Sequence, residues 1–252
     1  MMKEFLNKFS KYYIIFCIYA LIGWLYEVLW MWFVVPPKHF INRGVLLGPF
    51  LPIYGFGMLI LLFLLNKFMS VKHRLGKPLN LIVSISVIST FIYTTVIEYT
   101  TVPKILSVTE YLQRFGIGLL ITNLVCIGIV YTVIVITNNK KLKELDVTIV
   151  LVFLAIWIIT TLIEYISHFA IDKLTGNLLW DYTKDFLNIN ARVNWDASRN
   201  FAIGGTLLLY TIQPLINKYL PKLKDNKRII ITCIIGIPML LDFIFHVILK
   251  LI

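Results

Sequence analysis

Seven long apolar stretches dominate this sequence, and they constrain the fold more than any motif does. Each approaches the roughly 20 mainly apolar residues that a helix needs to cross a hydrocarbon core about 30 Å thick. Hydrophobic residues make up 59% of the chain and charged residues 15%, against about 45–50% and 25% in soluble domains. The sequence therefore predicts an all-α, polytopic membrane bundle of about seven transmembrane helices, forming one transmembrane domain. The expected helices cover residues 12–35, 50–66, 80–101, 115–137, 147–170, 200–220 and 229–251.

Basic residues are distributed unevenly between the expected loops. If the N-terminus lies in the cytoplasm, 15 of the 24 Lys and Arg residues fall in inner segments, as the positive-inside rule requires. We therefore expect a multi-pass protein of the cell membrane with a cytoplasmic N-terminus and an outer C-terminus. Topology accounts for most of the net charge of +11, and membrane lipid is the expected partner. Nucleic acid is not, because no soluble domain is left to bind it.

One carboxylate lies late in each of four expected helices: Glu27, Glu98, Glu164 and Asp242. Two of them share a context, since residues 94–99 read TTVIEY and residues 160–165 read TTLIEY. The separation of Glu27 from Glu98 is similar to that of Glu164 from Asp242. This spacing suggests a parallel internal repeat with halves 12–101 and 147–251, in which the fourth helix is a connector.

A charged side chain near the centre of a membrane helix costs roughly 2.5–3.5 kcal/mol on insertion scales, so it is usually paired or lines a wet cavity. All four carboxylates are expected in the outer halves of their helices. They could meet in one outward-facing polar pocket, or each could lie high enough to contact water or an interfacial arginine.

Two expected outer loops carry further polar residues. Residues 36–57 read PPKHFINRGVLLGPFLPIYGFG, and this irregular backbone is tolerated at membrane depth only when it is buried in protein or lines a cavity. The second loop, which contains Trp180 and extends to Arg192, again places an Arg after an Asn. Arg43 and Arg192 are the expected partners of Glu27 and Glu164, either as structural ion pairs or as binding groups for an anionic part of a solute.

Several of these segments together resemble a known family. They are GWLYE, NRGVLLGPFLPIYGFG, and the later EY, WDY and NINARV segments, which lie roughly in residues 20–60 and 160–205. They are similar to the family named putative ABC transporter type IV, the CmpB-like permeases. The resemblance implies a membrane-spanning permease component. Two positions depart from the family pattern: Leu51, where the family usually has Cys, and Ala191, where it usually has Gly, which bears on a tight backbone turn there.

The sequence contains no GxxxxGK[ST] phosphate-binding loop, so an ATPase would be a separate subunit. No cofactor is expected. The leading hypothesis is a permease or substrate-binding membrane component for a small-molecule solute. Its candidate binding residues are Glu27, Asn42, Arg43, Glu98, Glu164, Trp180, Asp181, Tyr182, Asn190, Arg192 and Asp242.

Two other classes of function stay open. A membrane-embedded enzyme or a metal- or haem-binding protein is suggested by Glu164 with His168 and by Asp242 with His246, because residues four apart share a helix face. A structural or regulatory membrane partner without a substrate is the third class.

Overall fold

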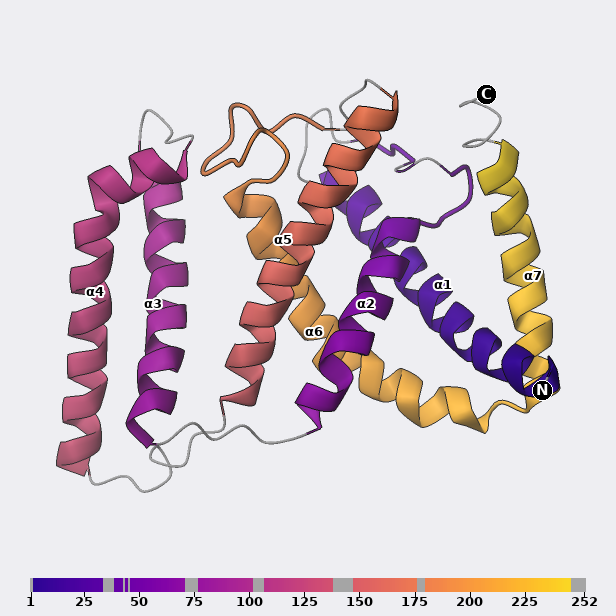
Figure 1. The fold of residues 1–252 in the computed structure, drawn as a ribbon, viewed down its shortest axis with the longest axis horizontal. Helices are drawn as coiled ribbons and strands as arrows, with labels where there is room; N and C mark the ends of the chain where they lie inside the picture. Colours follow the sequence, from indigo (N-terminus) through magenta and orange to yellow (C-terminus); the bar gives the residue numbers. More distant parts are fainter. Residues whose placement is uncertain are drawn as a thin grey trace. The chain divides into compact units, whose positions relative to one another are not determined.

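The chain forms seven α-helices and one short 3₁₀ helix in the residues that the structure, a computed structural model, describes (Figure 1). These residues are 2–33, 39–42, 44, 46–70, 77–101, 107–137, 147–175 and 180–245. No β-strand occurs within these ranges, so the prediction of an all-α fold is confirmed. The helices are α1 (Met2–Phe33), α2 (Pro52–Met69), α3 (Lys77–Thr100), α4 (Val108–Thr137), α5 (Thr148–Thr175), α6 (Trp195–Tyr219), η2 (Leu220–Lys222) and α7 (Asp225–Phe243).

Five of the helices, α1 to α5, are long and apolar enough to cross a membrane. In the described residues, α6 and α7 form as expected but are not among these five helices. Helix α6 carries Asp196, Arg199 and Lys218 and has Pro214 in its interior, while α7 begins with the polar sequence DNKR. Helices are therefore confirmed in the expected spans 200–220 and 229–251 as far as Phe243, and residues 246–251 lie outside the described residues. The crossing of the membrane by α6 and α7 stays a prediction.

The chain divides into two compact units, one of residues 1–64 and 207–252 and the other of residues 65–206. We call them unit 1 and unit 2. Helices α2 and α6 contribute to both units. The internal repeat expected from residues 12–101 and 147–251 stays a prediction.

In unit 1, helix α1 packs against α7 and, through two glycines, against α2. A Cβ atom on Gly23 would lie 2.2 Å from the ring of Tyr54, and one on Gly55 would lie 2.5 Å from the ring of Phe16. Small residues allow membrane helices to approach this closely. Tyr19 is buried on the same helix, and its hydroxyl donates to Gln213 Oε1 at 2.8 Å.

In unit 2, α3 and α4 lie side by side and antiparallel (Figure 1). Polar contacts join the two helices: the Ser89 hydroxyl donates to Asn123 Oδ1 at 2.8 Å, and the hydroxyls of Thr94 and Tyr111 lie 2.9 Å apart. Such bonds between membrane helices contribute about 0.6–2 kcal/mol each.

Helix α5 meets α3 and α6 through aromatic rings. The ring of Phe91 lies 5.8 Å from that of Phe153 and 5.9 Å from that of Trp157, and the ring of Trp195 lies 5.0 Å from that of Trp157. We call these four residues the aromatic layer. Edge-to-face ring pairs of this kind add about 0.5–1.5 kcal/mol beyond the area that they bury.

Candidate functional site

The four predicted carboxylates lie late in four helices, Glu27 and Asp242 in unit 1 and Glu98 and Glu164 in unit 2. Each of them accepts a hydrogen bond from a different part of its own unit. The two units are considered in turn.

Glu27 is bound by a tyrosine of the next helix. The Tyr54 hydroxyl donates to Glu27 Oε1 at 2.6 Å, and the close approach at Gly23 brings the Tyr54 ring against α1. The expected partner Arg43 lies outside the described residues.

Asp242 binds the loop that follows α1. Its two carboxylate oxygens accept the backbone amides of Leu47 at 3.1 Å and Gly48 at 2.8 Å. Charge-assisted bonds from backbone amides are shorter and stronger than neutral ones. This carboxylate therefore anchors the loop to α7, although the two segments are almost 200 residues apart in sequence.

Asn42 organises the same loop from within. Its Oδ1 accepts a bond from the Trp24 indole at 2.6 Å, and its Nδ2 donates to the carbonyls of Leu46 at 3.2 Å and Leu47 at 3.1 Å. The amide side chain thereby uses its donors and its acceptor inside the protein. Leu46 and Leu51 of this loop are buried, whereas Leu47 is exposed.

In unit 2, Glu98 forms an ion pair that the sequence did not predict. Arg199 Nη1 lies 2.6 Å from Glu98 Oε2, and the two side chains are only 10% and 11% exposed. Arg199 also pairs with Asp196, one turn earlier on α6, and its guanidinium lies 6.0 Å from the centre of the Tyr99 ring. A detectable signal was present, because Asp196 and Arg199 have the spacing of a helical ion pair. The expected sixth helix began at residue 200 and so left both residues in a loop.

The loop before α6 covers the end of α5. Glu164 is 5% exposed and accepts a bond from the Tyr182 hydroxyl at 3.3 Å. His168, one turn later and 1% exposed, has its Nε2 2.8 Å from the carbonyl oxygen of Trp180. Trp180 and Tyr182, which belong to the WDY segment, therefore bind one face of α5.

Arg192 pairs with Asp172, whereas the sequence predicts Glu164 as its partner. The distance from Arg192 Nη2 to Asp172 Oδ2 is 2.7 Å. Asp172 follows Glu164 by eight residues, about 12 Å along the helix, and so lies closer to the loop. The Trp180 indole donates to the Arg192 carbonyl at 2.8 Å, which joins the two ends of the loop.

A tight turn places Arg192. Asn190 and Ala191 both have positive φ, 51° and 58°, and the turn is closed by a bond from the Arg192 amide to the Ile189 carbonyl at 3.1 Å. Two successive left-handed residues are typical of a type I′ turn, which favours Asn and Gly. The turn thus forms in spite of Ala191, and Asn190 Nδ2 donates to the Tyr165 hydroxyl at 2.9 Å.

Asp181 has a local role in this loop. Its Oδ1 accepts the amide of Thr183 at 2.8 Å as well as the Thr183 hydroxyl. These two bonds lower the pKa of Asp181 below its ordinary value. The exposed carboxylate therefore stays ionised at neutral pH and supports the bend after Trp180.

A family model covers most of the chain. The model described as "Putative ABC-transporter type IV" matches residues 14–112 and 104–247. The chain belongs to this family. No curated protein and no solved structure matches it.

The structure groups the predicted site residues by unit. Unit 1 brings Asp242 to the loop that contains Asn42, and unit 2 brings Glu164 to Trp180 and Tyr182 through the end of α5. A single pocket that contains all four carboxylates stays a prediction.

The metal-binding hypothesis concerns His168 and His246. His168 binds the Trp180 carbonyl, and His246 lies outside the described residues. Among the residues that the structure describes, no group of three His, Cys, Asp or Glu side chains could hold a metal ion.

Proposed function

We propose that this chain is the membrane-spanning permease component of a transport system, and that the charged residues at one end of unit 2 bind part of a small solute. The observation that carries the proposal is the burial of Glu98, Glu164 and Arg199 in a chain of membrane-length helices. Ionisable residues within membrane segments are costly and mark solute or ion pathways.

The ion pair of unit 2 suggests how a solute would be accepted. Arg199 divides its guanidinium between Glu98 and Asp196. A solute group that takes the place of one carboxylate leaves the other in contact with the arginine. The buried guanidinium therefore keeps a counter-ion throughout the exchange, which avoids the high cost of an unpaired charge.

The finer form of the proposal is an outward-facing polar pocket lined by the four carboxylates together with Arg43 and Arg192. It is supported by the loops, because Asp242 binds one expected outer loop and Glu164 binds the other. Residues at the base of such loops would respond to movements of the loops during solute entry.

Energy for transport would come from a separate ATPase subunit. The sequence has no phosphate-binding loop of the GxxxxGK[ST] type, and the family model describes an ABC transporter. Purification of the tagged chain from native membranes is expected to recover an ATP-hydrolysing protein. A preparation that repeatedly lacks one would contradict this part of the proposal.

The pocket is tested by uptake of labelled cations, zwitterions and polyhydroxylated solutes in cells that express the chain. We expect Glu98→Gln to lower uptake at least tenfold at unchanged surface expression. Glu110→Gln is the matched control, because Glu110 pairs with Arg114 at the surface of the same unit, where the two side chains are 35% and 53% exposed. Equal uptake by the two variants would contradict a role for Glu98 in binding.

A further inference from the structure

Exposed lysines gather at one end of unit 1, where α1 and α7 begin and α6 ends. Asn7, at the start of α1, donates its side-chain amide to Asp225 Oδ2 at 2.7 Å and so holds the start of α1 beside that of α7 (Figure 1). The exposed lysines follow from both sides of this contact, in α1, at the end of α6, in η2 and in the first residues of α7. We call them the lysine surface: Lys8, Lys11, Lys218, Lys222, Lys224 and Lys227.

The carboxylates at this end leave the lysine surface positively charged. Asp225 accepts bonds from the side chains of Asn7 and Arg228, so its charge is used by groups outside the lysine surface. Among the residues that the structure describes at this end, Glu4 is the other carboxylate, and it is exposed. Six exposed ammonium groups thus lie near one exposed carboxylate, and the surface attracts anions.

Helix α1 is long enough to place its lysines among lipid headgroups. It has 32 residues, about 48 Å, whereas the hydrocarbon core of a bilayer is about 30 Å thick. The apolar run of the helix begins after Lys11. Phe5, Phe9 and Tyr12 are exposed on either side of Lys8 and Lys11. Exposed rings next to lysines are typical of the interface between membrane and water.

The end of α6 has the same combination of ring and lysine. Tyr219 is exposed, and the ammonium groups of Lys218 and Lys222 lie 5.4 and 5.3 Å from the centre of its ring. Attraction to the ring keeps both lysines on one patch. A lipid interface accommodates the ring and the ammonium groups together, and for this reason the surface is better suited to lipid than to an acidic protein.

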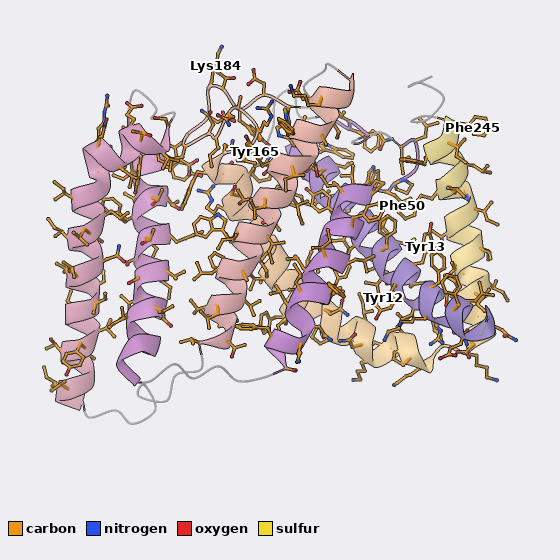
Figure 2. All side chains as sticks on the ribbon, viewed as in Figure 1. Tyr12, Tyr13, Phe50, Tyr165, Lys184 and Phe245 are labelled. Atoms are coloured by element: carbon orange, nitrogen blue, oxygen red, sulfur yellow. The ribbon has the colours of Figure 1, made fainter. Side chains whose placement is uncertain are left out.

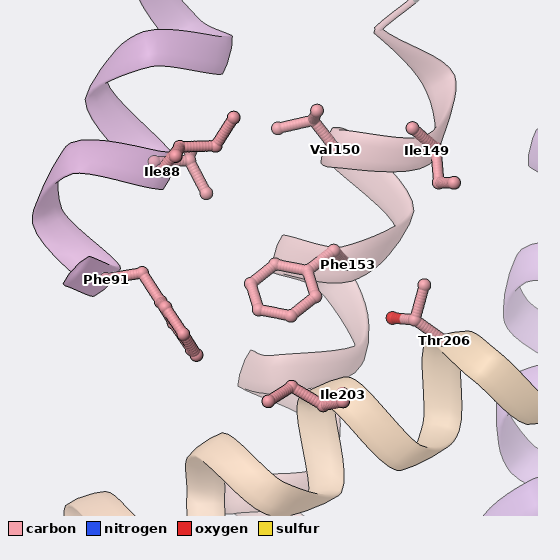
Figure 3. Close-up of a pocket in the computed structure, with 8 residues that line it drawn as sticks. Ile88, Phe91, Ile149, Val150, Phe153, Ile203 and Thr206 are labelled. Atoms are coloured by element: carbon pink, nitrogen blue, oxygen red, sulfur yellow. The ribbon is translucent and has the colours of Figure 1, made fainter. Parts of the chain in front are cut away.

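A groove in unit 2 has a different character. Side chains of α3, α5 and α6 line it, among them Ile88 and Phe153 (Figure 3). Thr206 also lines the groove, and its hydroxyl donates to the Ala202 carbonyl at 2.7 Å. Because no charged side chain lines the groove, it offers nothing that distinguishes one lipid headgroup from another. The lysine surface, in contrast, selects by charge.

We propose that the lysine surface of unit 1 binds the phosphate-bearing headgroups of anionic phospholipids. Clusters of about four to eight basic residues beside a membrane helix are typical of such binding. The positive-inside rule predicts that this end faces the cytoplasm, where the leaflet carries anionic lipid. The inference concerns a partner of the chain and does not depend on which solute the chain transports.

The probe is radiolabelled dioleoyl phosphatidylglycerol, added to the full chain in detergent micelles. It is expected to bind at least tenfold more tightly than dioleoyl phosphatidylcholine, which has the same acyl chains and no net charge. The preference should decrease at about 1 M salt, where charges are screened within about 3 Å. Equal binding of the two lipids at low salt would overturn the proposal.

A pair of double variants locates the binding. Lys218→Gln/Lys222→Gln should lower the preference for phosphatidylglycerol at least fivefold, and Lys218→Arg/Lys222→Arg, which keeps both charges, should retain it. Lys173→Gln/Lys184→Gln is the control, because it removes two exposed lysines of unit 2. Equal effects of the two Gln variants would overturn the assignment to this surface.

Two further measurements distinguish other occupants. Ile88→Trp fills the groove of unit 2 and should leave the preference unchanged, so a lost preference would assign the lipid to the groove and overturn the proposal. Soluble glycerol phosphate should not displace the labelled lipid, and displacement would identify a site for free phosphate instead. A chain that shows no lipid preference but loses a copurifying protein in Lys218→Gln/Lys222→Gln would identify a protein interface, which also overturns the proposal.

Discussion

Three kinds of donor bind the four membrane carboxylates: a tyrosine hydroxyl at Glu27 and Glu164, backbone amides at Asp242, and a guanidinium at Glu98. These donors differ in what their removal would leave behind. Loss of a tyrosine hydroxyl removes one hydrogen bond to a charged acceptor, which is worth about 1.5–3 kcal/mol. Loss of the guanidinium leaves a buried charge without its counter-ion, which costs more.

At the residue scale, Arg199→Met should destabilise the protein by about 3–5 kcal/mol, because Glu98 would keep its charge and lose its counter-ion. The double variant Glu98→Gln/Arg199→Met should recover most of this loss. Urea unfolding in detergent micelles measures both effects. Arg114→Met removes an exposed pair and should cost less than about 1 kcal/mol. A loss in Arg199→Met no greater than that of Arg114→Met would contradict a buried pair.

The left-handed turn gives a second prediction at this scale. Ala191→Gly should stabilise the protein by about 0.5–1 kcal/mol. The change relieves about 1–2 kcal/mol of strain in the left-handed backbone. Part of this gain, about 0.4–1 kcal/mol, is lost because Gly increases the entropy of the unfolded chain. Ala197→Gly, within α6, should instead destabilise by about 1 kcal/mol. Thermal unfolding compares the two, and the same sign for both would argue against the positive φ of Ala191.

At the scale of elements, contacts between helices and loops are made by residues far apart in sequence. Asp242 anchors the loop before α2 to α7, and the WDY loop lies over α5 through Trp180 and Tyr182. Helix α4 is different, because no residue in the most apolar stretch of Val108–Val133 is buried within the chain. Its apolar surface is suited to lipid.

The α1–α2 contact provides an element-scale test. Gly55→Ala would place a Cβ atom 2.5 Å from the Phe16 ring and 2.8 Å from the Phe16 carbonyl oxygen, so overpacking should cost about 1–3 kcal/mol. Gly57→Ala is the control, since nothing lies within 4 Å of that Cβ position, and it should be neutral or stabilising by up to about 1 kcal/mol. Unfolding in micelles compares them. Equal stability of the two variants would refute the close approach of α1 and α2.

For the whole molecule, the orientation in the membrane stays a prediction. Lys184 lies in the loop beyond the end of α5 that carries Tyr165, whereas Tyr12 and Tyr13 belong to the first half of α1 (Figure 2). The positive-inside rule predicts that the loop of Lys184 lies outside and the start of α1 inside.

This orientation is tested with single-cysteine variants in which Cys17, Cys126 and Cys233 are replaced. An impermeant thiol reagent applied to intact cells should label Lys184→Cys. It should label Lys8→Cys and Lys224→Cys only after the membrane is opened. All three lysines are exposed, so access to the reagent depends on the side of the membrane. The reverse pattern would invert the topology.

The sequence predicted the helices well and their ends less well. Helix α1 begins at Met2 and α6 at Trp195, ahead of the expected residues 12 and 200. Both helices continue past the apolar stretch, because helical hydrogen bonds do not require an apolar environment. The sequence also placed one carboxylate late in each of four helices, which the helix bounds confirm.

The sequence by itself determined the membrane class, the seven helices and the positions of the carboxylates, because these follow from local hydropathy and from the cost of charge in hydrocarbon. Only the tertiary structure decided the partners: Arg199 for Glu98, Asp172 for Arg192, and the amides of Leu47 and Gly48 for Asp242. A partner depends on the register of separate segments against one another. That register is set by packing between residues distant in the chain, which no local pattern encodes.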